Sequence, residues 1–190
     1  MIAIVLFGKP GAGKGTQAEF LKEKYNLTHI STGDVFRFNI KNETELGKKA
    51  QEFINKGELV PDSITIDMLK KEVEKNMDKA GFLFDGFPRT IAQAEALDAF
   101  LQSINLQVTA TVALEADDEV LVQRILERGK TSGRADDQDE TKIRTRYEEY
   151  NEKTAPLIEY YKNQDKYYAV NGIGSIAEIT DRLSTVIDRF

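Results

Sequence analysis

A glycine-rich segment near the start of the chain has the composition and spacing of a phosphate-binding loop. Residues 8–16 read GKPGAGKGT, and they follow directly on the apolar run IAIVLF at residues 2–7. A buried strand that ends in such a turn, with a helix after it, directs backbone N–H groups and a helix N-terminus at a phosphate chain. Lys14 is placed to reach the outer phosphates. The segment therefore predicts a site for the polyphosphate of a nucleotide.

The residue after Lys14 departs from the general form of this loop. It is Gly15, where the usual pattern has the hydroxyl that binds Mg²⁺, and a hydroxyl comes one place later at Thr16. A tight turn between strand and helix, without a ligand, is the alternative interpretation. If Mg²⁺ is bound, we expect it to be held through water and a distant carboxylate.

Two further segments combine polar and arginine side chains at the ends of predicted strands. The run STGD at residues 31–34 is followed by Arg37, and the run DGFPR begins at Asp85 and ends at Arg89. A serine or aspartate in the first run can cap a helix, and Asp85 can stabilise a turn, but these roles do not explain the two arginines. A carboxylate at a strand end beside a phosphate loop suits a water-mediated Mg²⁺ site, which makes Asp85 the candidate ligand.

Arginines recur between residues 124 and 146. Arg124 and Arg128 lie four residues apart, on one face of a predicted helix, while Arg134 falls in a polar stretch and Arg146 in the next predicted helix. Guanidinium groups bind phosphate oxygens through two parallel hydrogen bonds, which lysine cannot do. Any one of these arginines could instead pair with a neighbouring acid on a solvated face. As a set they favour a cluster around phosphate groups.

The elements that must position these residues alternate between strand and helix. Strands are predicted at 2–7, 28–31, 82–86, 108–114 and 167–170, and helices at 14–25, 34–56 with a break, 62–77, 90–104, 117–128, 137–163 and 175–188. This order predicts a parallel sheet covered on both faces, with binding loops at the carboxyl ends of its strands. Residues 130–140 and 31–60 are the candidate mobile segments.

The composition is that of a globular protein with few special features. Of its 190 residues 41% are hydrophobic and 31% charged, and the net charge of −6 disfavours binding to nucleic acid. The longest apolar run has six residues, so we expect no membrane span, and the N-terminus does not resemble a secretory signal. The absence of cysteine excludes disulfides, a thiol nucleophile and a cysteine-ligated zinc site. We expect a cytoplasmic monomer.

Five segments, in order and along nearly the whole chain, resemble the adenylate kinases. They are GKPGAGKGTQ at 8–17, STGDVFR at 31–37, GELVPD at 57–62, DGFPRTIAQAEAL at 85–97 and GRADD at 133–137. That family also has glycine and then threonine after the loop lysine, which accounts for Gly15. The resemblance implies an α/β P-loop fold with a five-stranded parallel sheet and helices on both faces. It implies one kinase domain at 1–190, with a helical monophosphate-binding insertion at 31–60 and a short lid at 127–137.

The resemblance also implies a reaction, the reversible transfer of a phosphoryl group from MgATP to AMP to give two ADP, which maintains the balance of adenine nucleotides. The acceptor oxygen of AMP is already anionic at pH 7, so no general base is needed, and catalysis reduces to alignment, charge neutralisation and exclusion of water. The cofactor is Mg²⁺. A short lid without cysteine implies no structural zinc, and the single histidine, His29, is interpreted as structural.

The roles of individual residues follow from the same resemblance. The ATP site would comprise Gly11, Ala12, Gly13, Lys14, Gly15, Thr16, Arg124, Arg128 and Gly174. The AMP site would comprise Thr32, Gly33, Arg37, Glu58, Leu59, Val60, Gly86, Phe87, Pro88, Arg89, Gln93, Arg134 and Arg146. Gln93 would contact the adenine edge, and Asp85 would orient hydrated Mg²⁺. The catalytic set would be Lys14, Arg89, Arg124, Arg128, Arg134 and Arg146.

The last arginine depends on how the family spacing is counted. Counting forward from Arg134 leads to Thr145, whereas counting back from the run TAP at 154–156 leads to Arg146. Threonine cannot neutralise a phosphoryl group, so we assign Arg146 and infer a one-residue insertion. Arg144 is the alternative.

Other functions compatible with a phosphate loop remain as alternatives. The nearest alternative is a kinase for UMP or CMP, although Thr32 and Gln93 favour adenine. GTP could also replace ATP as the phosphoryl donor. A GTP-dependent switch protein would need the motifs NKxD and DxxG. The run NKGE at 55–58 ends a predicted helix and lacks the aspartate, and DKAG at 78–81 precedes its strand. An inactive nucleotide-binding module is disfavoured by the retained arginines.

Overall fold

The centre of the molecule is a five-stranded sheet in the order β2-β3-β1-β4-β5, in which every neighbouring pair of strands is parallel. The computed structural model describes residues 1–190 with the exception of the side chain of Ala135. The strands are β1 (Ile2–Phe7), β2 (Leu27–Ser31), β3 (Gly81–Asp85), β4 (Ala110–Glu115) and β5 (Tyr167–Asn171). The predicted α/β fold with a five-stranded parallel sheet is confirmed.

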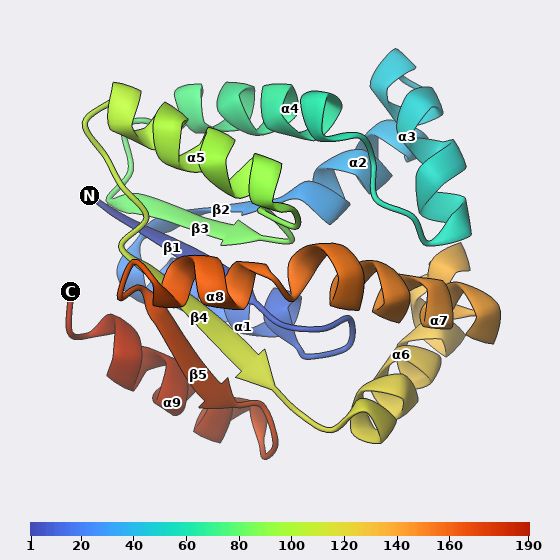
Figure 1. Ribbon diagram of the computed structural model, residues 1–190. Coiled ribbons are helices and arrows are strands. Elements are labelled where there is room, and N and C mark those ends of the chain that lie inside the picture. The colour runs from blue at the N-terminus through green and yellow to red at the C-terminus, as the bar shows by residue number, and fades with distance from the viewer.

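Helices cover both faces of this sheet, because its strands are apolar on both sides. In β1, Ala3, Val5 and Phe7 face one side and Ile4 and Leu6 face the other, and all five are buried. The first side packs against α4 (Asp62–Glu74), α5 (Ile91–Ser103) and α8 (Leu157–Lys162). The second packs against α1 (Lys14–Tyr25), α6 (Asp118–Ser132) and α9 (Ile176–Ile187). Figure 1 shows α4 and α5 together on one side of the sheet and α9 on the other.

The predicted insertion forms a small unit beside the sheet. Helices α2 (Thr32–Lys41) and α3 (Glu45–Lys56) lie together at the end of α4 (Figure 1), and the break predicted within 34–56 falls between them. Phe36, Ala50, Val60 and Met68 form a hydrophobic cluster separate from the two that cover the sheet. Because Met68 belongs to α4, this unit includes part of that helix as well as residues 31–60.

Two predicted helices differ from those observed. The helix predicted at 117–128 continues to Ser132, so the first residues of the predicted loop 130–140 are helical, and a 3₁₀ turn, η1 (Ala135–Asp137), follows. The helix predicted at 137–163 is divided into α7 (Glu140–Glu149), the π-helical turn η2 (Tyr150–Thr154) and α8. Pro156 explains the division, because proline cannot continue the hydrogen-bond pattern of the helix, and the N–H of Ala155 donates instead to Tyr150 O at 2.7 Å.

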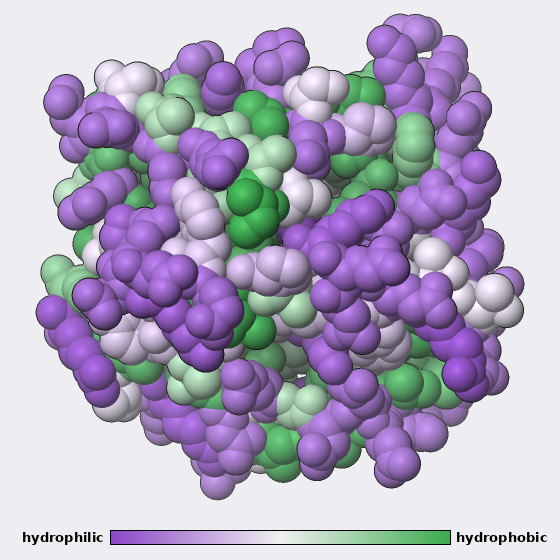
Figure 2. Space-filling view, in the orientation of Figure 1, coloured by the Kyte–Doolittle hydropathy of each residue, from purple (hydrophilic) through white to green (hydrophobic). Residues whose placement is uncertain are grey.

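Hydrophilic residues predominate on the face shown in Figure 2, and hydrophobic residues form small separate patches. No helix in the described part of the chain is both long and apolar enough to cross a lipid bilayer.

Candidate active site

The phosphate loop lies where the central strand β1 meets α1. Gly11 and Gly13 have φ angles of 85° and 92°, in the region that residues with a Cβ rarely adopt. A Cβ on Gly11 would also stand 2.6 Å from the carbonyl oxygen of Leu121, whereas one on Gly13 would meet no atom within 4 Å. The loop conformation therefore depends on glycine, and it leads directly into the N-terminus of a helix, which favours a bound anion.

Lys14 folds back over this loop. Its Nζ donates to the carbonyl oxygens of Gly8 at 2.8 Å and of Lys9 at 3.2 Å. Burial lowers the pKa of Lys14 to about 8, with Asp85 opposing this shift and the nearby arginines adding to it. A polyphosphate beside the ammonium group would favour its charged form. Lys14 is thus a cation whose surroundings improve when an anion binds.

Asp85, at the end of β3, is a carboxylate close to the start of α1. It is 8% exposed, and its Oδ2 lies 3.6 Å from Nε2 of His29 and 3.9 Å from where a Cβ of Gly15 would stand. Burial alone would raise the pKa of Asp85, but His29 and Lys14 outweigh it and lower the pKa. Asp85 is therefore ionised at neutral pH.

This single carboxylate fits a magnesium ion that is held mainly by phosphates. Mg²⁺ typically keeps several water ligands and is bound through one or two carboxylates together with substrate phosphates. Within the described residues no group of three or more His, Asp or Glu side chains could hold a metal ion without such help. The residues present therefore suit a metal that arrives with a nucleotide.

A cavity lies between α2, α3 and the carboxyl ends of β2 and β3. Ten residues predicted for AMP line it, namely Thr32, Gly33, Arg37, Glu58, Leu59, Val60, Gly86, Arg89, Gln93 and Arg146. The sequence analysis missed Phe36, Ile54, Gly57, Thr65 and Asp136, which also line it. Phe36 and Ile54 had no distinguishing signal, because an apolar residue on a helix faces a core as often as a ligand.

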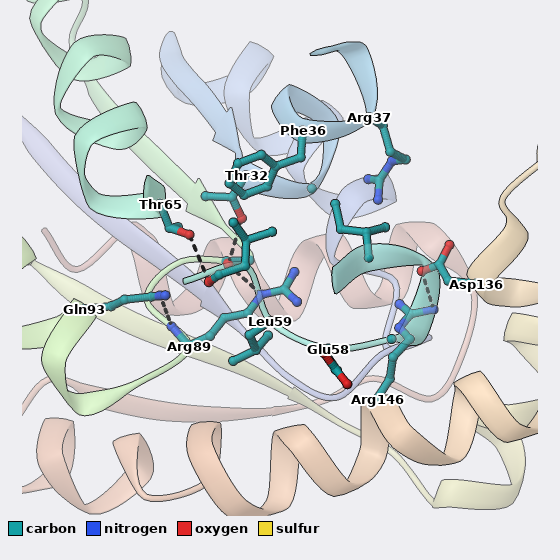
Figure 3. A pocket seen from close by; sticks show the side chains of 15 residues that line it. Thr32, Phe36, Arg37, Glu58, Leu59, Thr65, Arg89, Gln93, Asp136 and Arg146 are labelled. Atoms are coloured by element: carbon teal, nitrogen blue, oxygen red, sulfur yellow. Dashed lines mark hydrogen bonds and ion pairs between the residues drawn. The ribbon is translucent and has the colours of Figure 1, made fainter. Parts of the chain in front are cut away.

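The inner end of this cavity carries buried polar side chains, among them Thr32 and Gln93. Thr32 and Gln93 are each 2% exposed. Thr32 Oγ1 donates to Gly86 O at 2.9 Å, and Gln93 Oε1 accepts from the backbone N–H of Arg89 at 2.8 Å (Figure 3). Both groups border the cavity and retain hydrogen-bonding capacity for a ligand. This end of the cavity is suited to a flat heterocycle with polar edges.

Guanidinium groups from three elements turn into the same cavity. Figure 3 shows those of Arg37, Arg89 and Arg146 directed inward. Arg37 pairs with Asp34 at 2.5 Å, but Arg89 donates only to the carbonyl oxygen of Gly86, at 2.7 Å, and has no carboxylate partner among the described residues. Burial, together with the charge of Arg146, lowers the pKa of Arg89 to about 10. Arg89 is therefore a partly buried cation that has no ion-pair partner within the described part of the chain.

Asp137 holds two of the predicted arginines. Its carboxylate is 0% exposed, accepts from Arg128 at 2.6 and 2.8 Å and accepts from Arg146 at 2.7 Å. Asp136 lies 3.1 Å from Arg146 as well. Burial would raise the pKa of Asp137, but the two guanidinium groups outweigh it and lower the pKa. The sequence analysis missed this role, although an acid pair within an arginine-rich stretch is the signal that indicates it.

A second cavity joins the loop to these arginines. It is lined by Gly8, Pro10 and Lys14 from the loop and by Arg89 and Arg146 from the other side. Gly57, Leu59, Gly86, Arg89 and Arg146 line both cavities. Lys14 and Arg89 therefore face one space, into which phosphates from two nucleotides could enter.

Several predicted site residues lie away from both cavities. Arg124 donates to the carbonyl oxygen of Gly172 at 3.0 Å, and Gly174 is exposed in the same loop between β5 and α9. Arg134 stands 3.6 Å from Asp34, and so connects the predicted lid with the predicted insertion. Phe87 belongs to the core that covers one face of the sheet, so its side chain does not face a ligand.

The structure also separates the two candidates for the last arginine. The side chain of Arg144 is 73% exposed and pairs with Glu140, on the same helix. Arg146 lines both cavities and is 19% exposed. Of these two arginines, only Arg146 can contact a molecule in either cavity.

Comparisons with known proteins agree on one family. The model of the adenylate kinase family matches residues 6–166. Adenylate kinases of Flavobacterium psychrophilum and Flavobacterium johnsoniae are 76% and 74% identical to this chain, each over 99% of both sequences. The adenylate kinase of Bacteroides thetaiotaomicron is 48% identical over the full length of both.

Proposed function

The chain belongs to the adenylate kinase family, and on that premise we propose that its two cavities are the acceptor pocket and the transfer space of one active site. The protein transfers a phosphoryl group between ATP and AMP, with ADP as the product. One observation carries the assignment of the site. Lys14 from the phosphate loop and Arg89 and Arg146 from the acceptor pocket line the same cavity.

The donor half is the phosphate loop. We assign the outer phosphates of ATP to the N–H groups of residues 11–16 and to Lys14, whose ammonium would exchange the carbonyl oxygens of Gly8 and Lys9 for phosphate oxygens. Arg124 and Gly174 would lie toward the donor base, because the Arg124 hydrogen bond to Gly172 joins α6 to that loop. ATP is the family's donor, and the described residues contain nothing that favours GTP.

The acceptor half is the first cavity. Arg37 and Arg89 would bind the phosphate of AMP, and Thr32 and Gln93 would face its base. Arg89 supports this assignment most directly, because a partly buried guanidinium without an ion-pair partner gains more from a bound phosphate than an exposed one does. The phosphate oxygen that attacks is already anionic, so no residue has to remove a proton.

The transferring group would lie between the halves, near Lys14, Arg89 and Arg146. These cations neutralise charge in the transition state, and they hold two mutually repelling anions in line. Asp137 accepts a hydrogen bond from Arg128 and would thereby hold it close to the transferring phosphoryl group. Asp85 would hold the water ligands of Mg²⁺, and the ion, when bound, would neutralise charge on the phosphates of the donor.

Residues 31–60 and 127–137 are proposed to close over the nucleotides and exclude water. The 3.6 Å approach of Arg134 to Asp34 links these two segments, which supports a shared closing movement. The monomeric state, the cytoplasmic location and the lack of structural zinc stay predictions.

Acceptor selectivity tests the proposal. The protein is mixed with MgATP and with AMP, UMP, CMP or GMP in turn, and diphosphate formation is followed by chromatography. We expect rapid formation of ADP with AMP and at least a hundredfold lower efficiency with each of the others, because the polar inner end of the acceptor pocket rejects a mismatched base. Faster turnover with UMP or CMP than with AMP would contradict the assignment.

A further inference from the structure

The chemical character of the acceptor pocket depends on the direction in which the amide of Gln93 points. Gln93 lies in the first turn of α5, and its amide borders the cavity (Figure 3). An amide offers an acceptor oxygen on one side and donor N–H groups on the other. A half-turn about the Cγ–Cδ bond exchanges the oxygen and the NH₂ group without changing the shape of the side chain. The orientation therefore decides which base edge the pocket can bind.

Two neighbours fix this orientation. The backbone N–H of Arg89 donates to Gln93 Oε1 at 2.8 Å, and Gln93 Nε2 donates to Asp62 Oδ1 at 2.8 Å. A backbone N–H only donates, and a carboxylate only accepts. A turned amide would set oxygen against oxygen at Asp62 and N–H against N–H at Arg89. Electrostatic repulsion would therefore replace both of these buried hydrogen bonds.

Asp62 is itself held in place. It is the first residue of α4, where the helix N-terminus favours a negative charge. Its second oxygen, Oδ2, accepts from Thr90 Oγ1 at 3.1 Å, and the same Thr90 oxygen accepts from the backbone N–H of Gln93 at 3.1 Å. Both oxygens of the carboxylate therefore serve the first turn of α5. Asp62 can neither rotate nor turn away without breaking this network.

The network leaves one donor for a ligand. Gln93 Nε2 carries two hydrogens, and within the described residues it donates only to Asp62. Adenine has an acceptor nitrogen, N1, at its polar edge, whereas a 6-oxopurine carries N1–H, a donor, at the same place. An amide N–H held toward this edge pairs with adenine and opposes the N1–H of a 6-oxopurine. A turned amide would reverse the preference.

We propose that Asp62 is a specificity-determining residue, which makes the acceptor site select adenine over 6-oxopurine monophosphates by holding Gln93 in one orientation. The inference rests on the proposed function, in which Gln93 contacts the acceptor base. Asp62 is a positioning residue, because it acts through Gln93 and does not line the cavity.

The variant Asp62→Asn tests this role. Asparagine keeps the size of the side chain, but its amide can donate or accept, so residue 62 no longer opposes a turned Gln93 and only the backbone N–H of Arg89 still does. Efficiencies, kcat/KM, are measured with AMP and with IMP, which differ at position 6 and in the proton on N1. We expect the ratio of the AMP efficiency to the IMP efficiency to fall at least tenfold. The change should appear mainly in the KM values for the acceptors, with the KM for ATP and the melting temperature nearly unchanged.

A second variant and a matched control accompany it. Asp62→Ser also supplies a group that donates or accepts, and it should lower the same ratio if Asp62→Asn folds poorly. Asp67→Asn removes the same charge from another position on the same helix and should leave the ratio within about twofold of the wild type. An equal loss of efficiency with AMP and IMP in both Asp62 variants would show a merely structural residue and overturn the proposal.

Gln93→Met distinguishes failure of this inference from failure of the proposed function. Methionine has a similar length but no amide. A rise in the KM for AMP in Gln93→Met, with unchanged ratios in both Asp62 variants, would overturn the orientation role and leave the acceptor pocket standing. Unchanged AMP and IMP kinetics in Gln93→Met as well would overturn both, because the base would then bind elsewhere.

Discussion

The proposed donor and acceptor halves of the active site are built by different means. The phosphate loop is one continuous segment, and its shape comes from backbone angles that only glycine adopts readily. The acceptor half takes Arg37 from α2, Arg89 from the loop after β3 and Arg146 from α7. A site made of backbone is encoded locally. A site made of long side chains requires the whole fold to bring its members together.

The cations of the proposed site also differ in how their charges are balanced. An aspartate pairs with each of the arginines Arg37, Arg128 and Arg146. Among the described residues, Lys14 donates only to carbonyl oxygens, and Arg89 donates only to a single carbonyl oxygen. Paired arginines are held in position, and a phosphate must compete with their partners. A phosphate that approaches Lys14 or Arg89 meets no such competition from the described carboxylates. We therefore expect these two cations to contribute most to catalysis and the paired ones to contribute to stability as well.

Arg89→Met should have the largest effect. Loss of this partly buried guanidinium should lower kcat about a thousandfold, the upper range for removal of one group that stabilises transition-state charge, without unfolding the protein. Steady-state kinetics and circular dichroism measure the two effects. Arg144→Met is the control, since that exposed arginine faces neither cavity and its loss should change kcat less than twofold. A kcat near that of the wild type in Arg89→Met would remove Arg89 from the site.

Substitutions in the loop should affect the donor alone. Gly11→Ala combines a positive φ with a contact of 2.6 Å to Leu121 O, so the KM for ATP should rise by roughly tenfold to a hundredfold. Gly13→Ala has the strained φ without the contact and should have a smaller effect. The KM for AMP should stay unchanged in both. Equal increases for ATP and AMP would show that the two halves are not built independently.

Asp137→Asn should reduce stability through loss of the charge between Arg128 and Arg146. We expect the free energy of unfolding at pH 7 to fall by about 2 kcal/mol, as for a lost hydrogen bond between charged groups. The folded-state pKa of Asp137 is lowered, so its contribution is present above the unfolded value of about 3.9 and is lost as the pH falls through the folded one.

Denaturant unfolding of both proteins between pH 3 and pH 7 measures this difference. It should shrink toward the acid end of the range. Asp181→Asn, at an exposed position on α9, is the control and should show no such trend. A difference that is constant with pH would indicate that Asp137 acts through its shape and not its charge.

The pH dependence of ATP binding should be the smallest of these effects. Because the pKa of Lys14 is lowered to about 8 in the free protein and phosphate favours the ammonium form, ATP binding should take up protons near pH 8. Affinity should fall several-fold between pH 8 and pH 9. Titration calorimetry in two buffers of different ionisation enthalpy measures the uptake. Lys14→Met should abolish it, and proton uptake that persists in this variant would assign the titration to another group.

The same contrast explains how much could be predicted from the sequence. The alternation of strand and helix patterns was sufficient to predict the parallel sheet, and the glycine-rich run indicated where the proposed donor half begins. The end of α6 was predicted too early, because Gly129 resembles a helix end although the helix continues to Ser132. The π-helical turn before Pro156 was missed, since the proline ring predicts a disturbance but not its form.

The acceptor half was predicted only where a motif carried it. Arg37, Arg89 and Gln93 belong to recognisable runs, and the structure places them around one cavity. Asp62 and Asp137 were missed, although they belong to the runs at 57–62 and 133–137, because their contacts with Gln93, Arg128 and Arg146 exist only in the folded chain. An acid pair within an arginine-rich stretch indicates that pairing occurs, but a single sequence does not show which side chains the acid holds.

Tracing the phosphoryl group tests the central claim most directly, that donor and acceptor meet in one water-excluding space. The protein is given Mg²⁺, AMP and ATP labelled at the γ-phosphate, and the products are separated before equilibrium is reached. We predict that the label appears in the β-phosphate of the ADP formed from AMP, with only a trace in inorganic phosphate. Label that appears in inorganic phosphate as fast as in ADP would contradict direct transfer between the two halves.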